Sequence, residues 1–350
     1  MTGEELSKLV KSGEFFSGDD FTGMDLSGQD LSGGIFTDVI FDDCDFSGAD
    51  LREATFNESG LKRANLSNTA LKEANFIQSD LSGAKLSGSS MDFTKFIECK
   101  LEKADLSGLE TDMAVFTDCA MAGSLFKGAA LINCVFSGCD MKKADFTEFR
   151  MENTFFYECS FESNAFAGAV MNLSAFAKAE LVGIDFKGMD LTRLQFMECK
   201  LDGCDFSGSK MDQAGFMGAS LKKTRFDECK LGMANFCEAD LESASLVKAN
   251  LEKAIMQKAK ISRADLSGAK MIKSQLAEVK AELSNFSDTD LTHADLSHAE
   301  INEANFKGAV MSRTNLHQVK DEKTIWSGSS KSLALGTDKK RLKAEQWGKK

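Results

Sequence analysis

Large apolar residues recur at every fifth position along most of the chain. From Phe16 to Leu316, each fifth residue is Leu, Phe, Met or Ile, and the exceptions are Thr111 and Ala281. This period matches neither the 3.6 residues per turn of an amphipathic helix nor the two-residue alternation of a half-buried strand. The residue two places before each large one is usually small, and the remaining positions are mostly polar or glycine. Each five-residue unit is therefore expected to bury one large and one small side chain.

These units resemble those of a known repeat family. Stretches such as ADLREA, ANLSNT, ADLSGA and ANFKGA match the A-(D/N)-L-X-X motif of pentapeptide-repeat proteins. The resemblance implies an all-β solenoid, a right-handed quadrilateral β-helix in which four pentapeptides form one square coil. For a chain of this length it implies about fifteen coils, with short helical caps at the termini.

Four units per coil predict a second period of twenty residues, and the phenylalanines follow it. Twelve of them stand at twenty-residue intervals without a gap. They are Phe16, Phe36, Phe56, Phe76, Phe96, Phe116, Phe136, Phe156, Phe176, Phe196, Phe216 and Phe236. We expect their rings to stack at roughly the 4.8 Å that separates neighbouring strands.

The two ends depart from the repeat and are predicted to be helical. Residues 1–15 contain Thr2 and Glu5, which are spaced as a capping box and predict a short capping helix. The β-helix is expected over residues 16–320. Residues 321–350 are interpreted as a C-terminal linker and a second capping helix, with Leu342 and Trp347 packed on the last coil.

Composition and charge narrow the class of partner. No stretch approaches the roughly 20 apolar residues of a membrane span, and the first residues lack the pattern of an export signal. Residues 1–60 hold 14 acids and 3 bases, whereas residues 321–350 hold 4 acids and 8 bases. A nucleic-acid binder needs a basic stripe along its body, which this chain lacks. We therefore expect a soluble protein with no membrane and no direct nucleic-acid ligand.

The cysteines are better explained by packing than by chemistry. Nine of the ten, all except Cys237, fall on the small inward position. Free cysteine acts as a small apolar side chain, and no pair has the two-residue spacing of a typical metal site. Unpaired thiols are typical of a reducing compartment, which predicts a cytoplasmic protein. Export by a non-classical secretion system stays an alternative.

No catalytic arrangement stands out from the repeat. His293, His298 and His317 occupy positions expected to face outward, with His298 and His317 about one coil apart. No nucleophile–base pair or phosphate-binding loop interrupts the frame, and a packed coil leaves no cleft for a small-molecule substrate. The sequence thus predicts no enzyme, no cofactor and no bound metal.

One corner of the coil carries apolar residues where polar ones are expected. Such an extended apolar stripe is a candidate surface for a protein partner or for a homodimer. Alternatively, these side chains lie along the wall and cover a neighbour. The candidate residues are Phe93, Ile97, Met113, Val115, Ile132, Val135, Phe155, Tyr157, Leu173, Met197, Met217 and Met233.

Two functions follow from this pattern. The first is a non-catalytic scaffold or adaptor that binds a protein through the apolar corner. The tail ALGTDKKRLKAEQW resembles that of repeat proteins associated with type VI secretion, which implies a bacterial secretion context and no residue roles. The alternative is DNA mimicry, because family members that confer quinolone resistance resemble duplex DNA and engage DNA gyrase. The interspersed lysines of the middle coils imitate evenly spaced phosphates poorly.

Overall fold

The fold is a parallel β-solenoid with a short helix near each terminus. The computed structural model describes residues 1–347 and divides into two compact units, Met1–Glu180 and Leu181–Lys350. In both units the chain repeats a turn and a short extended segment every five residues, as the sequence predicts. The fold class of the pentapeptide repeat is confirmed.

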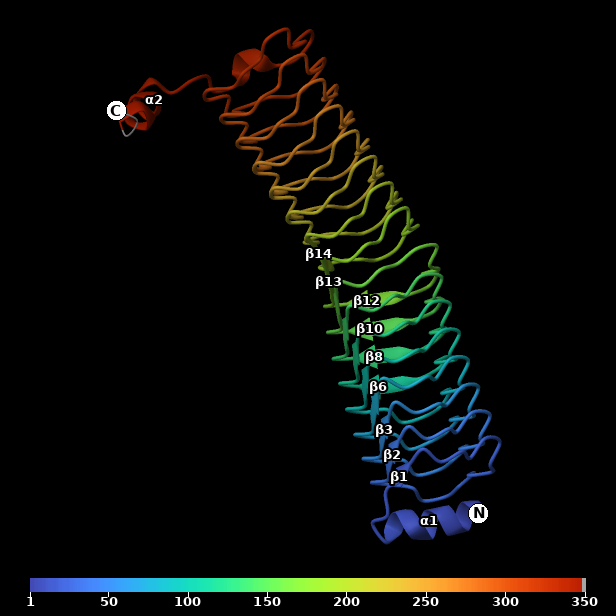
Figure 1. Cartoon of the computed structure of the whole chain (residues 1–350). Helices are drawn as coiled ribbons and strands as arrows, with labels where there is room; N and C mark the ends of the chain where they lie inside the picture. The colour runs from blue at the N-terminus through green and yellow to red at the C-terminus, as the bar shows by residue number, and fades with distance from the viewer. Residues whose placement is uncertain (348–350) are drawn as a thin grey trace. The chain divides into compact units, whose positions relative to one another are not determined.

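The first unit stacks successive coils through parallel strands. Phe16 is the register partner of Phe36, and Phe36 is the partner of Phe56, so neighbouring strands are twenty residues apart (Figure 1). The strands of this wall are β1 (Phe16–Ser17), β2 (Ile35–Thr37), β3 (Thr55–Asn57), β4 (Asn75–Ile77), β5 (Lys95–Ile97), β7 (Val115–Thr117), β9 (Val135–Ser137), β11 (Phe155–Tyr157) and β13 (Ala175–Ala177).

A second wall of the first unit contains a four-stranded parallel sheet in the order β12-β10-β8-β6. These strands are β6 (Glu110–Asp112), β8 (Ala130–Ile132), β10 (Arg150–Glu152) and β12 (Val170–Asn172). Elsewhere the coils pair through single parallel bridges with the same twenty-residue spacing. About nine turns of the solenoid contain strands of the longer wall, which is fewer than the fifteen coils expected. The remaining coils pair through single bridges and contain no strand on this wall.

The hydrogen bonds of one unit explain why the second residue of its motif is Asp or Asn. In the turn that follows Asp50, the Arg52 backbone N–H donates to Asp50 Oδ1 at 3.1 Å. The Ala54 N–H donates to the Leu51 carbonyl at 3.1 Å and closes the turn. Glu53, between them, adopts the left-handed conformation with φ 60°. The Asp50 carboxylate thus accepts from the Arg52 N–H, which is the one backbone donor of this unit that bonds neither within the turn nor to a neighbouring coil.

The next coil supplies the other partners. Leu51 donates its N–H to the Ala70 carbonyl at 2.8 Å, and Ala70 donates to the Ala49 carbonyl at 3.0 Å. Each unit is therefore bonded to the units twenty residues before and after it. This register places identical positions of successive coils above one another.

The core consists of the large and small inward side chains. The phenylalanine ladder stacks as expected within each unit, with ring centroids of Phe56 and Phe76 4.9 Å apart and those of Phe216 and Phe236 4.8 Å apart. The nine inward cysteines are fully buried, and Cys237 is half-buried. Stacking of like on like brings the inward side chains of successive coils into contact with one another.

Helix α1 (Gly3–Lys11) covers the first coil. Thr2 and Glu5 form the predicted capping box, and Leu6 and Val10 are buried. Ser7 Oγ donates to the Asp30 carbonyl at 2.7 Å, which fixes the helix on the coil. The N-terminal helix therefore shields the inward residues of the first turn.

At the other end the coil pairing continues beyond residue 320. Asn305 pairs with Ile325, and the Trp326 ring stacks on Phe306 at 4.8 Å, because Trp326 occupies the large inward position of the frame. The chain ends in a 3₁₀ turn (Lys331–Leu333) and helix α2 (Lys339–Trp347). Trp347 is 85% exposed, so the expectation that it packs on the last coil is wrong. The second unit also contains strand β14 (Gln195–Met197).

Thiol titration tests the assignment of the cysteines to the core. Burial raises the pKa of Cys44 to about 11 and that of Cys204 to about 12, which suppresses the reactive thiolate. Ellman's reagent should therefore modify Cys237 alone in the native protein, and the other nine thiols only after unfolding. Cys237→Ser should remove the fast phase. Several fast-reacting thiols in that variant would contradict the packing.

Candidate protein-interaction surface

None of the twelve residues predicted to form an apolar corner is buried. Nine belong to the first unit, and Met197, Met217 and Met233 belong to the second. Leu173 is 58% exposed, and Phe93 and Met113 are each 44% exposed. These residues are therefore available at the surface, and they do not cover one another completely.

Part of this set forms a continuous row on the longer wall. Val115, Val135 and Phe155 are successive register partners on strands β7, β9 and β11, and we call these three residues the apolar row. The Tyr157 ring lies beside Phe155, with ring centroids 6.2 Å apart and planes inclined by 26°. The Tyr157 ring thus extends the row on its last strand.

Three further apolar residues occupy turn positions at the corner beside this row. Phe93, Met113 and Leu173 adopt positive φ angles of 59°, 56° and 47°. This conformation costs a side-chain-bearing residue roughly 1–2 kcal/mol, and most equivalent turns of the chain use glycine or polar residues, with Met233 and Leu283 as further apolar cases. The fold imposes this conformation on nearly every unit, so the feature that the fold does not require is the solvent exposure of these large apolar side chains, which points to a use for them at the surface.

Two asparagines interrupt the predicted apolar corner. Asn133 and Asn153 stand between Met113 and Leu173 in the same column, and Asn153 Nδ2 donates to Asn133 Oδ1 at 3.4 Å. Asn133 Nδ2 in turn donates to Asp112 Oδ1 at 2.8 Å. The surface is therefore an apolar row beside a mixed corner, and it is not one unbroken stripe.

The wall on the other side of the corner carries a shallow open groove. Strands β6, β8, β10 and β12 line it, with Glu110 and Arg150 beside the apolar Ile132 and Val170. Val170 is 44% exposed and was not among the predicted residues, although its outward place in the frame could have revealed it. The groove adds charged and apolar contacts next to the corner.

Tyr157 also has a polar neighbour. Lys178 Nζ lies 3.2 Å from the Tyr157 hydroxyl oxygen and 5.4 Å from the centre of its ring. Lys178 also forms an ion pair with Glu158 at 3.7 Å. The aromatic end of the surface is thus amphipathic, like the residues that are enriched in protein interfaces.

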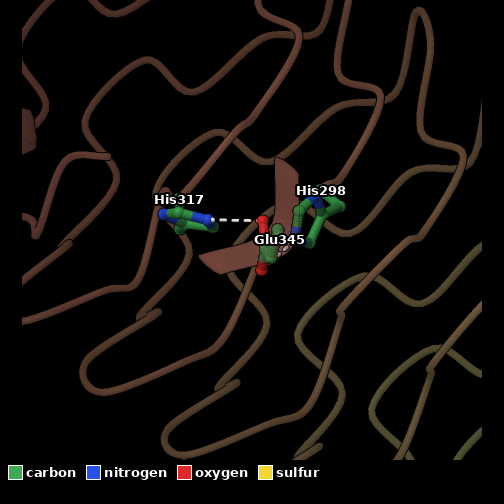
Figure 2. Close-up of side chains that lie close together, drawn as sticks. All are labelled: His298, His317 and Glu345. Atoms are coloured by element: carbon green, nitrogen blue, oxygen red, sulfur yellow. Dashed lines mark hydrogen bonds and ion pairs between the residues drawn. The ribbon is translucent and has the colours of Figure 1, made fainter. Parts of the chain in front are cut away.

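A second noteworthy cluster lies in the second unit, where helix α2 contacts the β-helix. We call His298, His317, Arg341 and Glu345 the polar knot. Figure 2 shows the Glu345 carboxylate between the two imidazoles. Glu345 Oε2 is 3.1 Å from His317 Nε2, and Glu345 Oε1 is 3.3 Å from His298 Nε2. Arg341 Nε donates to Glu345 Oε1 at 2.8 Å.

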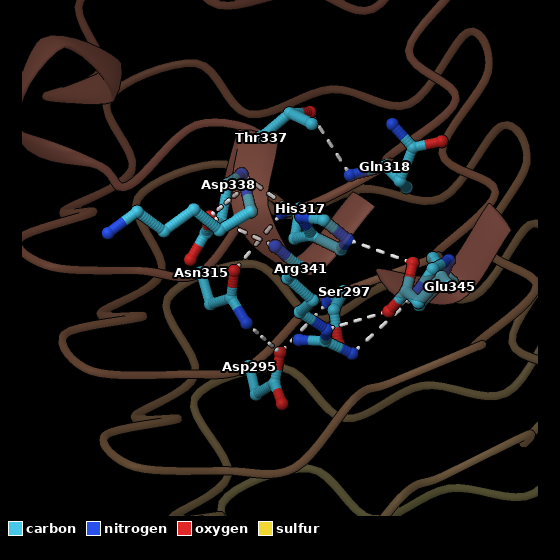
Figure 3. Close-up of polar contacts among 11 residues, drawn as sticks. Asp295, Ser297, Asn315, His317, Gln318, Thr337, Asp338, Arg341 and Glu345 are labelled. Atoms are coloured by element: carbon cyan, nitrogen blue, oxygen red, sulfur yellow. Dashed lines mark hydrogen bonds and ion pairs between the residues drawn. The ribbon is translucent and has the colours of Figure 1, made fainter. Parts of the chain in front are cut away.

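The hydrogen bonds around His317 define its tautomer (Figure 3). The Asp338 backbone N–H donates to His317 Nδ1 at 3.0 Å, so Nδ1 carries no proton and Nε2–H donates to Glu345. Asp338 Oδ1 also accepts from the Lys340 N–H at 2.7 Å and caps α2. The β-helix and the start of α2 are therefore joined by a chain of polar contacts.

Two histidines and a carboxylate are also the donors of many metal sites. Here the ligand atoms of His298, His317 and Glu345 lie within 4.8 Å of one another. A ligating histidine normally donates its second N–H to an acceptor, whereas His317 Nδ1 accepts from Asp338. The Arg341 guanidinium already neutralises Glu345. This arrangement fits a clamp for α2 and does not fit a metal without rearrangement.

The expectation that all three histidines lie at the surface is wrong for His317. Its side chain is 1% exposed, because α2 and the preceding segment cover it. The hydrogen bond from His317, together with those from Arg341 and His298, lowers the pKa of Glu345 to about 2. Glu345 is thus the charged centre of the contact.

Comparison with known proteins agrees with the repeat architecture. The model of a pentapeptide repeat region matches residues 34–111 and 184–256, and the model of eight pentapeptide repeats matches residues 114–153 and 284–320. No curated protein matches the chain. Between residues 1 and 347, no helix is long and apolar enough to cross a membrane.

Among solved structures, HetL, a pentapeptide repeat protein involved in heterocyst differentiation regulation in Nostoc sp. strain PCC 7120, is 20% identical. The match covers 86% of this chain and 97% of HetL, with a TM-score of 0.28. QnrB1, a plasmid-mediated fluoroquinolone resistance protein, is 18% identical over 56% of this chain and 88% of its own, with a TM-score of 0.30. Likenesses at this level carry no information about function.

The walls and their outward side chains define a repeat protein of the parallel β-solenoid class. The two family models together cover well over half of the sequence. The chain belongs to the pentapeptide-repeat family.

The pH dependence of α2 docking tests the polar knot. The pKa of Glu345 is lowered from 4.5 to about 2, so its contribution is full above pH 4.5 and disappears as the pH falls toward 2. In a Trp326→Phe variant, which leaves Trp347 as the single tryptophan, fluorescence anisotropy should stay constant from pH 7 to about 4.5 and then fall. Adding Glu345→Ala should give low anisotropy at every pH. A transition centred near pH 6.5 would show instead that protonation of the histidines controls the docking of α2.

Proposed function

We propose that this protein is a non-catalytic scaffold or adaptor that binds a protein partner, or a copy of itself, through the apolar row and corner of its first unit. The observation that carries the proposal is the exposure of Phe93, Met113 and Leu173 in left-handed turns. Each of these residues gives up conformational and solvation free energy in the isolated protein. Burial against a partner would recover the solvation part.

The character of this surface favours a macromolecule over a small ligand. Phe155 and Tyr157 offer large rigid rings of the kind that dominate binding free energy in protein interfaces. Arg150 and Glu110 stand at the neighbouring groove and can supply a polar rim. The groove is partly open to solvent, whereas small-molecule sites usually enclose most of their ligand.

DNA mimicry is supported less well by the same walls. Several carboxylates of the first coils are held by bases, as in the Arg63–Asp43 pair and the Lys62–Asp80 pair at 3.5 Å. Alternating charges of this kind do not reproduce the uniform negative rows of a DNA backbone. The resemblance of the tail to proteins of type VI secretion concerns cellular context alone, and the proposed binding mode does not depend on it.

Charge reversal on the aromatic residues tests the proposal. Phe155→Lys/Tyr157→Lys should abolish partner capture from native lysate, or reduce the mass measured by light scattering, because two cations cannot be buried in an apolar interface. Circular dichroism and thermal unfolding should change little, since both side chains point outward.

Ser47→Lys/Ser107→Lys provides the matched control. It adds the same charge to a different wall of the first unit, where both serines are half-buried beside turns. The control should bind like the parent protein. If mass and captured proteins are the same for the parent, the control and the aromatic variant, the proposed surface is not an interface.

A further inference from the structure

Helix α2 presents a basic and aromatic stripe that nothing in the described part of the chain covers. Lys340, Lys343 and Trp347 are spaced three and four residues apart, which places them on one side of a helix. They line a shallow hollow together with Ala344 and Gln346. Neither lysine has an ion pair with residues 1–347, and Trp347 is 85% exposed. We call Lys340, Lys343 and Trp347 the basic stripe.

The polar knot explains why this stripe stays at the surface. Arg341 and Glu345 contact the β-helix side through His298 and His317, and Leu342 beside them is half-buried. No residue of α2 is fully buried. The helix is therefore fixed through polar contacts on one side, while its other side carries an unsatisfied aromatic ring and two free cations.

The first coils of the first unit carry a surface of the opposite kind. Phe15 is 72% exposed and Ile35 is 53% exposed, and they directly precede the register partners Phe16 and Phe36. Ile40, 42% exposed, donates its backbone N–H to the Asp19 carbonyl at 2.9 Å. Asp19 and Asp38 are exposed and have no ion pair with any described residue. We call these five residues, three apolar and two acidic, the acidic patch.

We propose that the basic stripe of one copy binds the acidic patch of a second copy, head to tail. Trp347 would cover Phe15 and Ile35, and the two lysines would face Asp19 and Asp38. The distribution of charge along the chain agrees with this contact. Residues 1–60 contain 14 acids and 3 bases, whereas residues 321–350 contain 4 acids and 8 bases. Because the two contacting surfaces differ, each added copy leaves one of each free, so the association can continue beyond a dimer.

Sedimentation velocity of the full chain over a range of concentrations tests this contact. At about 50 mM salt the average mass should rise with concentration beyond that of a dimer, and at about 500 mM salt it should return toward the monomer. Lys340→Glu/Lys343→Glu and Asp19→Lys/Asp38→Lys should each weaken association by about tenfold or more. An equimolar mixture of the two variants should restore it, because every stripe then meets a patch of opposite charge.

Two controls make the result decisive. Lys258→Glu/Lys273→Glu makes the same charge change on exposed turns of the second unit and should associate like the parent. Phe155→Lys/Tyr157→Lys should also leave this association unchanged, which separates it from the proposed function. A concentration-independent mass, or variants that do not complement each other, would overturn the proposal.

Discussion

The fold depends on one constraint, the parallel pairing of each unit with the unit twenty residues away. Leu51 and Ala70 show its local form, in which backbone groups of neighbouring coils satisfy each other. A segment of three extended residues is too short to be stable alone, so each coil relies on the coils on either side. The uninterrupted frame of five follows from this dependence, because an inserted residue would turn polar side chains inward in every later unit.

This constraint separates structure from function within each unit. Inward positions are occupied mostly by stacked apolar side chains such as Phe, Leu and Ala, and packing restricts which residues they can hold. Outward positions need only be compatible with turns and solvent. The departures from polarity at Phe93, Phe155 and Trp347 are therefore the residues that the fold itself does not require. Both proposed contacts use such departures, one on the walls of the first unit and the other on α2.

The sequence predicts those features that repeat and misses those that do not. The phenylalanine ladder, the buried cysteines and the capping box at Thr2 all follow from spacing alone. Trp326 also occupies a large inward position of the five-residue frame. The residues around it do not match the repeat, so the sequence did not indicate that the coils continue beyond residue 320. The burial of His317 could not be foreseen, because it depends on where α2 is attached, and no periodicity relates Glu345 to the coils. The polar break at Asn133 was visible in the sequence and required only a column-by-column comparison.

The most direct test of this account compares two deletions in the second unit. Removing residues 251–255 deletes one complete unit and brings Met256 to the inward position of Leu251, so every later side chain keeps its inward or outward place. Removing residues 251–254 shifts every later position by one. Thermal unfolding followed by circular dichroism should give the five-residue deletion a cooperative transition close to that of the parent. The four-residue deletion should lose the β signal of the later coils. Equal loss in the two variants would contradict the claim that the five-residue frame specifies the fold.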